Sequence, residues 1–249
     1  MSGNVTGGVL VVGVVGDREQ VVAPLAHGEH PEAVLARHGL RALRARSARL
    51  AEGGALELTY EVTPLTGIPP EVPSTRRDPD VGDDEVGEPF QRVAAYALVT
   101  TDRHVLLTQF NSRTNVPGDW GLPGGGLDPG ESPDEGLHRE VWEETGQRIE
   151  LGPLLTVQSQ HWVGRAPDGR LEDFHAVRIV HRATCPSPSP VVVHDVGGTT
   201  ADARWVAFDE LDGYPLSSSW RELTELTALA DTANGTAAVD VPSDERAGE

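Results

Sequence analysis

The feature that most constrains this chain is a glycine-rich loop followed by a helix with well-marked ends. Ser132 can act as the N-cap, with Pro133 at the first helical position and Glu135 at the third, which is the pattern of a capping box. Gly146 supplies a left-handed stop at the other end. The spacing therefore predicts a helix from about Pro133 to Thr145, and the two caps fix the phase of the residues between them.

Three glutamates share one face of this predicted helix. At 100° per residue, Glu140, Glu143 and Glu144 fall within an arc of about 100°, and Leu137 and Val141 form an i,i+4 apolar pair on the adjoining face. Carboxylates this close repel one another, and clustered hard oxygen ligands suit Mg²⁺ or Mn²⁺. A solvated charged face is the alternative, and three such glutamates taken alone more often form one.

The wider segment decides between these two interpretations. From Gly125 to Gly146 the chain runs Gly-x5-Glu-x7-Arg-Glu-Val-x-Glu-Glu-x-Gly, with Glu131, Arg139 and Glu140 at fixed positions. This resembles the Nudix box at each fixed position but the last, and the chain is identified as a member of the Nudix hydrolase family. The resemblance implies an α/β fold, an α/β/α sandwich around a mixed sheet, in which the box forms a loop, a helix and a second loop.

The resemblance also implies a metal site and a reaction. Glu140, Glu143 and Glu144 match the metal-binding glutamates of the family, and the backbone carbonyl around Gly125 commonly completes the shell of Mg²⁺, for which Mn²⁺ can substitute. Water then attacks a phosphorus atom of a nucleoside diphosphate linked to another group. The expected substrate is therefore a small nucleotide: a nucleoside triphosphate, a nucleotide sugar or a dinucleotide.

Two further box residues are expected to act with these glutamates. Arg139 matches the arginine that orients a glutamate through a salt bridge, and Glu131 is the expected partner here. The predicted catalytic set is therefore Glu131, Arg139, Glu140, Glu143 and Glu144. Which carboxylate takes the proton from water stays open.

Many family members add an acidic residue from a later loop, either as a metal ligand or as the base. The candidates in this chain are Asp202, Asp195, and Glu172 with Asp173. We expect Asp202, because it comes just before a strand predicted over Arg204–Phe208. An ordinary loop acid is an equally frequent explanation for each candidate.

Four residues near the box are expected to contact the substrate: Arg92, Gln109, Phe110 and Trp120. Gln109 lies near the position where many relatives have a phosphate-binding arginine, which weakens any specific phosphate contact there. Phe110 and Trp120 flank the loop and are candidates to stack on a base, although aromatic residues in such places more often pack.

Two positions depart from the family pattern. The signature ends in an aliphatic residue, but position 147 is glutamine, and we expect the neighbouring Ile149 to take over its packing. Position 136 is glycine where alanine is usual, at a cost of up to about 1 kcal/mol in helix propensity. Neither departure alters the predicted metal ligands.

The acidic, Pro- and Gly-containing stretch Pro73–Glu88 is expected to divide the chain. The predicted parts are a small β-α-β-β unit over residues 1–72, an acidic linker over 73–89, a Nudix hydrolase domain over 90–233 and a disordered tail over 234–249. Strands are predicted over Val9–Val15, Leu43–Leu50, Ala55–Thr63, Arg92–Thr100, His104–Phe110, Ile149–Trp162, Phe174–Arg182 and Arg204–Phe208, and further helices over His30–His38 and Ser219–Ala230.

The composition excludes several functions. A net charge of -19 argues against binding to duplex nucleic acid or an anionic membrane, but a bound metal can still reverse the local sign for a small anionic substrate. The chain has no lysine, which excludes Schiff-base catalysis and a P-loop, and its single cysteine, Cys185, cannot form an intrachain disulfide. No apolar run is long enough to span a bilayer, so we expect a cytoplasmic protein, and by analogy a homodimer.

Two other functions remain open. A non-catalytic Nudix domain could sense a nucleotide sugar and act as a regulator, with the N-terminal unit as its partner-binding module. Such domains usually lose box glutamates, whereas this chain keeps them. A Nudix-fold isomerase is remote, because Cys185 lies outside the expected context.

Overall fold

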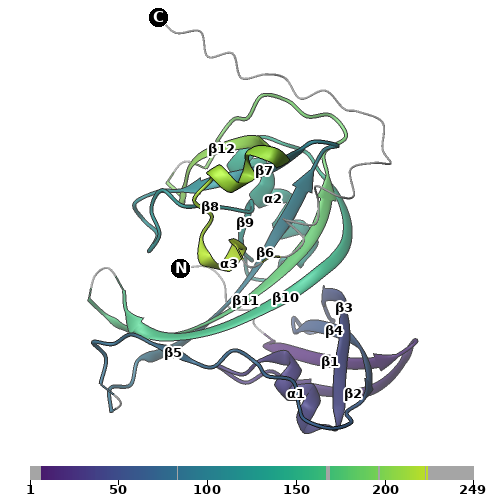
Figure 1. Cartoon of the computed structure of the whole chain (residues 1–249). Helices are drawn as coiled ribbons and strands as arrows, with labels where there is room; N and C mark the ends of the chain where they lie inside the picture. The colour runs from purple at the N-terminus through teal and green to yellow at the C-terminus, as the bar shows by residue number, and fades with distance from the viewer. Residues whose placement is uncertain (1–6, 83, 167–168, 196, 222, 224–249) are drawn as a thin grey trace, which may run out of the picture. The chain divides into compact units, whose positions relative to one another are not determined.

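The computed structural model describes residues 7–82, 84–166, 169–195, 197–221 and 223. The strands of this part of the chain form a four-stranded sheet and an eight-stranded sheet (Figure 1). Both sheets contain parallel and antiparallel pairs. The predicted α/β class with a mixed sheet is therefore confirmed.

The four-stranded sheet is formed by the first strands of the chain, together with one helix. Its elements are β1 (Val9–Val15), β2 (Arg18–Pro24), α1 (Pro31–Arg37), β3 (Leu40–Leu50) and β4 (Leu56–Pro64), in the strand order β2-β1-β4-β3. On α1, Leu35 is fully buried, and its side chain lies 3.1 Å from where a Cβ on Gly13 of β1 would be. Gly13 thus allows the helix to pack closely on the sheet.

The N-terminal unit contains one strand more than the predicted β-α-β-β order. β2 was missed because it is an edge strand: most of its side chains are exposed, and only Ala23 is buried. An edge strand of this kind carries little of the alternating apolar pattern by which strands are read from sequence.

The eight-stranded sheet contains the remaining strands and has the order β12-β7-β6-β11-β10-β5, with β8 paired to β7 and β9 paired to β6. Its strands are β5 (Arg76–Arg77), β6 (Glu88–Thr100), β7 (His104–Phe110), β8 (Trp120–Gly121), β9 (Gly124–Gly126), β10 (Glu150–Arg165), β11 (Leu171–Thr184) and β12 (Thr200–Ala207). The helices of this part are α2 (Pro133–Thr145), η1 (Phe208–Gly213) and α3 (Ser218–Arg221).

The predicted bounds hold for β1, α2 and β7, and the other predicted strands extend beyond their predicted range at one end or more. β10 and β11 are long, at 16 and 14 residues, and β12 begins at Thr200 rather than at Arg204. The predicted linker contains β5, which pairs in parallel with β10. Apart from β2, the longer strands were therefore recognisable from sequence, although their lengths depend on pairing partners, and the short strands β5, β8 and β9 were not predicted.

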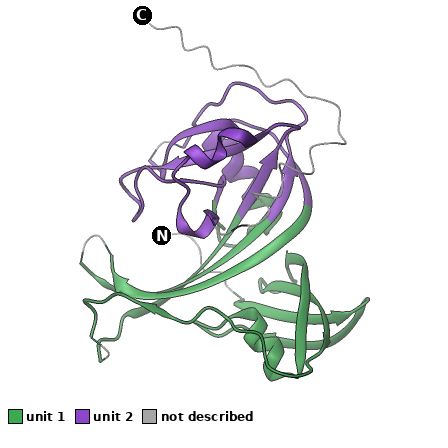
Figure 2. Ribbon diagram, in the orientation of Figure 1, with its two compact units in different colours: residues 1–95, 125–136, 153–180 green, residues 96–124, 137–152, 181–249 purple. Residues whose placement is uncertain are grey.

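The described chain divides into two compact units, shown in green and purple in Figure 2. Unit 1 contains residues 1–95, 125–136 and 153–180, and unit 2 contains residues 96–124, 137–152 and 181–249. These units do not follow the division proposed from sequence, whose boundaries stay a prediction. The predicted tail over 234–249 lies outside the described residues, as does most of the predicted helix Ser219–Ala230 beyond α3.

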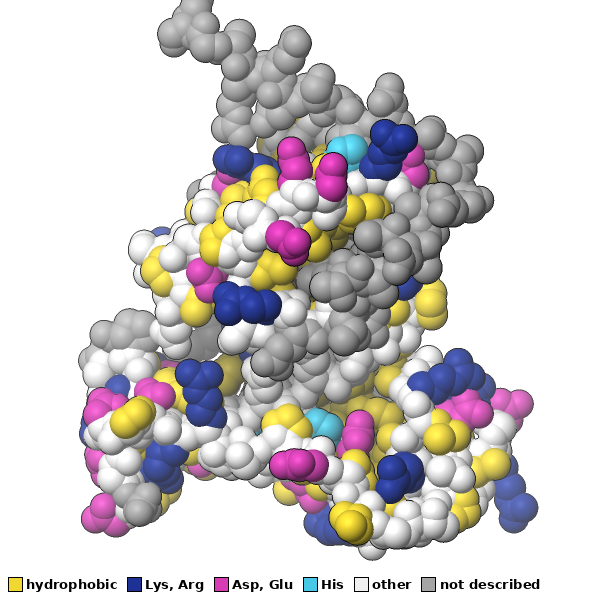
Figure 3. Space-filling view, viewed as in Figure 1, with side chains coloured by type: hydrophobic (Ala, Val, Ile, Leu, Met, Phe, Trp, Pro, Cys, Tyr) yellow, Lys and Arg dark blue, Asp and Glu magenta, His cyan; other side chains and the backbone are white. Residues whose placement is uncertain are grey.

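Two features concern binding to nucleic acid or to membranes: the distribution of surface charge and the length of the helices. Among the described residues on the face seen in Figure 3, acidic and arginine side chains lie interspersed and form no continuous basic patch. Within the described ranges, no helix combines the length and the apolar character that crossing a bilayer requires.

Candidate active site

Both predicted caps of α2 are present. The Glu135 carboxylate accepts the Ser132 backbone N–H (3.0 Å) and hydroxyl (2.7 Å), and the Glu135 N–H points back to Ser132 Oγ at 3.3 Å. At the other end, Gly146 has a φ of 72° and donates its N–H to the Trp142 carbonyl. The helix is therefore held in the phase that the spacing predicts.

Glu144 is the most buried of the box carboxylates, with 5% of its surface exposed. Its Oε2 accepts the Gly124 backbone N–H (2.9 Å), and its Oε1 accepts the Thr200 hydroxyl (2.6 Å). Burial nevertheless raises the pKa of Glu144 to about 8, and the nearby Glu140 and Asp195 carboxylates add to this, while the two hydrogen bonds oppose it. The negative charge at Glu144 is thus only partly compensated by the protein.

Arg139 brings a positive charge to the other two glutamates of the cluster. Its Nη1 lies 2.9 Å from Glu140 Oε1 and 3.2 Å from Glu143 Oε2. The Arg139 and Glu140 side chains are 27% and 17% exposed, so this pair is partly shielded from solvent. The guanidinium therefore fixes the positions of two carboxylates on the face that carries Glu144.

Glu131 lies in the loop before the helix. Its carboxylate accepts the Asp128 backbone N–H at 2.8 Å, which closes a turn of that loop. The side chain also lies against Gly136, where a Cβ would come within 2.9 Å of Glu131 Oε2. Glycine at position 136, where the family usually has alanine, therefore makes room for Glu131. The expected salt bridge between Arg139 and Glu131 stays a prediction.

The segment 185–195 is hydrogen-bonded to the C-terminal end of α2. The Glu143 and Thr145 carbonyls, which have no partner within the helix, accept the backbone N–H groups of His194 (2.7 Å) and Val192 (3.0 Å). The imidazole of His194 also stacks on the indole of Trp142, with ring centroids 4.5 Å apart. These contacts place the segment beside the box glutamates.

Gln147 is a structural residue that sequence reasoning missed. Its side chain is 1% exposed, and its Nε2 donates to the carbonyls of Thr145 (3.2 Å) and Ser189 (3.0 Å). Its Oε1 accepts the Ser189 N–H at 3.0 Å. Ile149 is buried, as expected, and the Gln147 side chain is buried as well and joins the end of the box to the segment 185–195.

The candidate acids of the later loop lie in different surroundings. Asp195 accepts the Thr200 N–H (3.4 Å) and is close enough to raise the pKa of Glu144. Asp202, the residue expected from sequence, instead forms an ion pair with Arg204 at 2.9 Å. The structure therefore brings Asp195 near Glu144, and Thr200 is hydrogen-bonded to both carboxylates.

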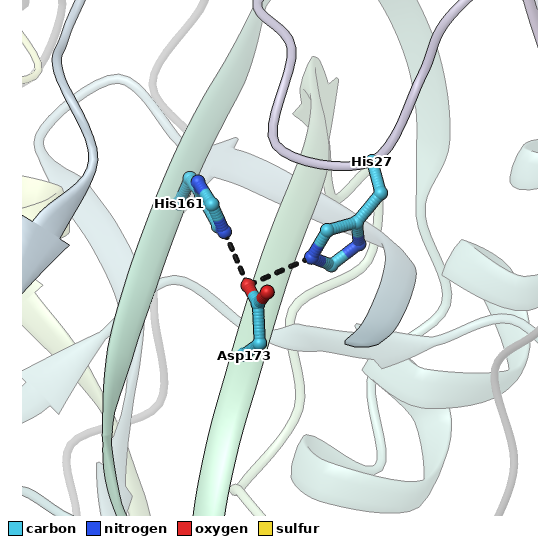
Figure 4. A group of neighbouring side chains, drawn as sticks. All are labelled: His27, His161 and Asp173. Atoms are coloured by element: carbon cyan, nitrogen blue, oxygen red, sulfur yellow. Dashed lines mark hydrogen bonds and ion pairs between the residues drawn. The ribbon is translucent and has the colours of Figure 1, made fainter. Parts of the chain in front are cut away.

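The remaining acid candidates, Glu172 and Asp173, lie on β11 in unit 1. Glu172 pairs with Arg170 at 3.3 Å. Asp173 contacts two histidines, His27 and His161 (Figure 4). Both acidic side chains therefore have partners within unit 1.

Two of the residues expected to bind substrate are engaged in packing or in loop structure. Trp120 is 5% exposed, with Arg204 over its ring (5.4 Å to the centroid) and Tyr214 against it edge-on. Gln109 Nε2 donates to the Gly118 carbonyl at 3.0 Å. These contacts support packing for Trp120 and loop closure for Gln109.

Arg92 and Phe110 each lie against a glycine of this region. In unit 1, a Cβ on Gly126 would be 2.8 Å from Nε of Arg92, whose side chain is exposed. In unit 2, the Phe110 ring is 2.7 Å from the Cβ position of Gly121. The absence of side chains at the two glycines allows Arg92 to lie on the box loop and Phe110 on β8.

A capped helix with clustered carboxylates, preceded by a glycine-rich loop, is the arrangement that the Nudix resemblance implies. The NUDIX domain family matches residues 90–227, more than half of the chain. Nucleoside triphosphatase NudI of Salmonella agona (strain SL483) is 31% identical over 142 residues, covering 56% of this chain and 98% of that protein. The protein of the same name from Salmonella newport (strain SL254) is 30% identical with the same coverage.

Solved structures of Nudix proteins are also similar to this chain. The MutT NUDIX hydrolase from Burkholderia pseudomallei shares 32% identity, covering 55% of this chain and 98% of that chain, with a TM-score of 0.42. The NUDIX domain of Shewanella oneidensis NrtR, solved with ADP ribose, shares 24% identity, covering 57% and 90%, with a TM-score of 0.45. The family match and the curated relatives carry the assignment: this chain belongs to the Nudix family and is a hydrolase of it. Use of a divalent metal is typical of this family.

Proposed function

We propose that this protein hydrolyses the phosphoric anhydride bond of a nucleoside diphosphate linked to another group, with a nucleoside triphosphate as the leading substrate. The observation that carries the proposal is the geometry around Glu144, a buried carboxylate fixed at both oxygens, beside Glu140 and Asp195. The curated relatives named nucleoside triphosphatase support the choice of substrate.

A divalent cation fits this group of residues. The donors are carboxylate oxygens, which Mg²⁺ prefers, and the charge of the buried Glu144 is incompletely compensated by its two hydrogen bonds. Glu140, Glu143 and Glu144 would hold the cation, with the Gly125 carbonyl as the further ligand that the resemblance implies. When bound, Mg²⁺ supplies charge neutralisation on the phosphates and lowers the pKa of a water molecule.

The residues of the chain do the positioning. Gly124 and Thr200 orient both oxygens of Glu144, and Arg139 orients Glu140 and Glu143. A carboxylate of this group accepts the proton of the attacking water. Among the candidate loop acids we propose Asp195 in place of Asp202, because Asp202 is paired with Arg204.

Arg92 is proposed as the contact for a substrate phosphate. Its guanidinium is exposed and lies against Gly126 of the box loop. Guanidinium groups bind phosphate oxygens through two parallel hydrogen bonds, which also orients the phosphate. Phe110 stays a candidate for stacking on the base. Trp120 and Gln109 are not proposed as substrate contacts, because Trp120 packs against Arg204 and Tyr214 and Gln109 is hydrogen-bonded to Gly118.

The test is a panel of nucleoside triphosphates, nucleotide sugars and dinucleoside polyphosphates, incubated with the protein and Mg²⁺ or Mn²⁺ and analysed by chromatography. We expect hydrolysis of at least one nucleoside triphosphate. Glu144→Gln should lower kcat/KM by at least about a hundredfold, since even an outer-shell partner of a metal ligand can be worth that much. The matched control is Glu150→Gln, the same change at an exposed glutamate of β10.

Two results would contradict the proposal. If a folded Glu144→Gln variant cleaved the substrate at the wild-type rate, Glu144 would not be part of the active site. A folded wild-type protein that cleaves no member of the panel with either metal would favour the nucleotide-sugar regulator instead.

A further inference from the structure

Three metal-binding side chains from distant parts of the sequence meet in unit 1 (Figure 4). His27 comes from the loop between β2 and α1, His161 from β10 and Asp173 from β11. One potential ligand atom of each residue lies within 4.8 Å of those of the other two. The side chains are 27%, 17% and 19% exposed, so the group is partly buried and still open to an ion from solvent.

The two imidazoles point at the same carboxylate oxygen. His27 Nε2 lies 2.9 Å from Asp173 Oδ1, and His161 Nε2 is in hydrogen-bond contact with that oxygen. Ligands around a tetrahedral Zn²⁺ with bonds of about 2.05 Å are about 3.3 Å apart. Small side-chain rotations would therefore open the group enough to admit a metal ion.

His161 already has the outer partner that a metal-binding histidine needs. Its second nitrogen, Nδ1, lies 2.7 Å from the hydroxyl of Thr75. Metal-bound histidines usually donate their other N–H to such a partner, which fixes the tautomer and the orientation of the ring. A hydroxyl can both donate and accept, so Thr75 suits the metal-free and metal-bound forms of His161.

The loop that carries His27 is held in place by a hydrogen bond to the buried His175. The Gly28 N–H donates to Nδ1 of His175 (3.1 Å), and His175 Nε2 lies 2.9 Å from Ser159 Oγ. His175 is fully buried and engaged at both nitrogens, so it supports the group and is not a further ligand. Gly28 has a φ of 73°, and a Cβ there would be 2.7 Å from Nδ1 of His161, so this loop approach requires glycine.

We propose that His27, His161 and Asp173 form a Zn²⁺ site that ties the β2–α1 loop to strands β10 and β11 within unit 1. Two imidazole nitrogens and one carboxylate oxygen are a donor set for Zn²⁺ and related transition metals, whereas Mg²⁺ prefers oxygen donors alone. Water would complete the coordination. This proposal does not depend on the proposed hydrolysis, which uses a different group of residues.

The test is a titration of the full-length protein with Zn²⁺ in excess Mg²⁺, which occupies all-oxygen sites. We expect one equivalent of Zn²⁺ to bind and to raise the melting temperature, because a ligand that binds only the folded state stabilises it. Co²⁺ in place of Zn²⁺ should give the visible absorption bands of a tetrahedral site. Glu144→Gln should bind Zn²⁺ as the wild type does, which separates this site from the box.

Variants of the three ligands and of their neighbours give a graded response. His161→Gln and Asp173→Asn should weaken Zn²⁺ binding by at least about a hundredfold and lose the thermal shift, and Thr75→Val should weaken it about tenfold. His38→Ala removes an exposed histidine of the same unit and should have no effect. Absence of Zn²⁺ binding by the wild type, or wild-type binding by a folded Asp173→Asn variant, would overturn the proposal.

Discussion

At the scale of single residues, Glu144 shows how the fold concentrates an unfavourable charge where a cation is expected. A carboxylate that is 5% exposed loses most of its hydration, and two hydrogen bonds do not restore it, so the pKa of Glu144 rises to about 8. One of those hydrogen bonds comes from Thr200, at the start of β12. A residue far away in sequence thus determines where the oxygen of Glu144 lies.

Removing that hydroxyl tests its positioning role. Thr200→Val keeps the shape of the side chain and should lower kcat/KM by about tenfold or more, because hydrogen bonds to charged groups are worth about 1.5–3 kcal/mol. The measurement is steady-state kinetics on the panel substrate that is cleaved best. Thr199→Val, at an exposed neighbour, should keep wild-type kinetics. Equal kinetics in both variants would mean that Thr200 does not orient Glu144.

His30 gives a prediction about pH. Its Nδ1 accepts the Glu32 N–H as the N-cap of α1, and burial lowers the pKa of His30 below 6.5. The unfolded chain therefore takes up the proton at a higher pH than the folded chain does. Stability from this group is complete above about pH 6.5 and is lost as the pH falls toward the folded pKa.

The measurement is urea unfolding at about pH 7.5 and about pH 5 for the wild type and His30→Asn. Asparagine is a good N-cap and does not titrate, so the variant should lose less free energy of unfolding between the two pH values. A loss as large as that of the wild type would exclude His30 as a source of the pH dependence.

At the scale of elements, the C-terminal end of α2 and the segment 185–195 are held together by several hydrogen bonds. Backbone hydrogen bonds from Val192 and His194 satisfy carbonyls of the last turn, and Gln147 binds both backbone groups of Ser189. The segment carries Asp195, which lies near Glu144. The departure of Gln147 from the aliphatic pattern thus serves the placement of the later loop.

Restoring an aliphatic side chain at this position should therefore harm the protein. Gln147→Leu should lower the free energy of unfolding by about 1–3 kcal/mol, because it leaves the Ser189 N–H and carbonyl without their partner. Urea unfolding measures this change, and the matched control is Gln20→Leu, the same change at an exposed glutamine of β2, which should leave the free energy of unfolding nearly unchanged. Unchanged or higher stability of Gln147→Leu would show that the hydrogen bonds contribute little.

At the scale of the whole molecule, the balance of charge is the dominant property. The chain has 39 acidic residues against 20 basic ones, which gives a net charge of -19. Several arginines form ion pairs at the surface, such as Arg44 with Glu61 and Arg49 with Glu57, but exposed pairs of this kind contribute little. Self-repulsion should therefore outweigh these pairs. The expected homodimer stays a prediction.

Salt should consequently stabilise the protein. Raising the ionic strength from about 0.01 M to about 0.15 M shortens the Debye length from about 30 Å to about 8 Å and screens the repulsion. A gain of about 1 kcal/mol would raise Tm by about 2–4 °C. Thermal unfolding in NaCl and in choline chloride measures this, and equal shifts in both salts would show screening rather than binding of Na⁺. A fall in Tm would mean that surface ion pairs dominate.

The sequence by itself determined the features that depend on neighbours along the chain. The bounds and the phase of α2 follow from Ser132, Glu135 and Gly146, because caps act within one turn, and the spacing of the box identified the family. The same local rules missed β2, whose strand pattern is weak because it pairs along only one edge.

Only the tertiary structure decided which distant residues come together. It placed Asp195 near Glu144, used Gln147 to hold Ser189, and brought His27 to His161 and Asp173. Each of these contacts joins segments that are separated in sequence by loops or strands. These contacts depend on how the strands pair and on the path of the loops. Neither can be predicted from the spacing of residues along the chain.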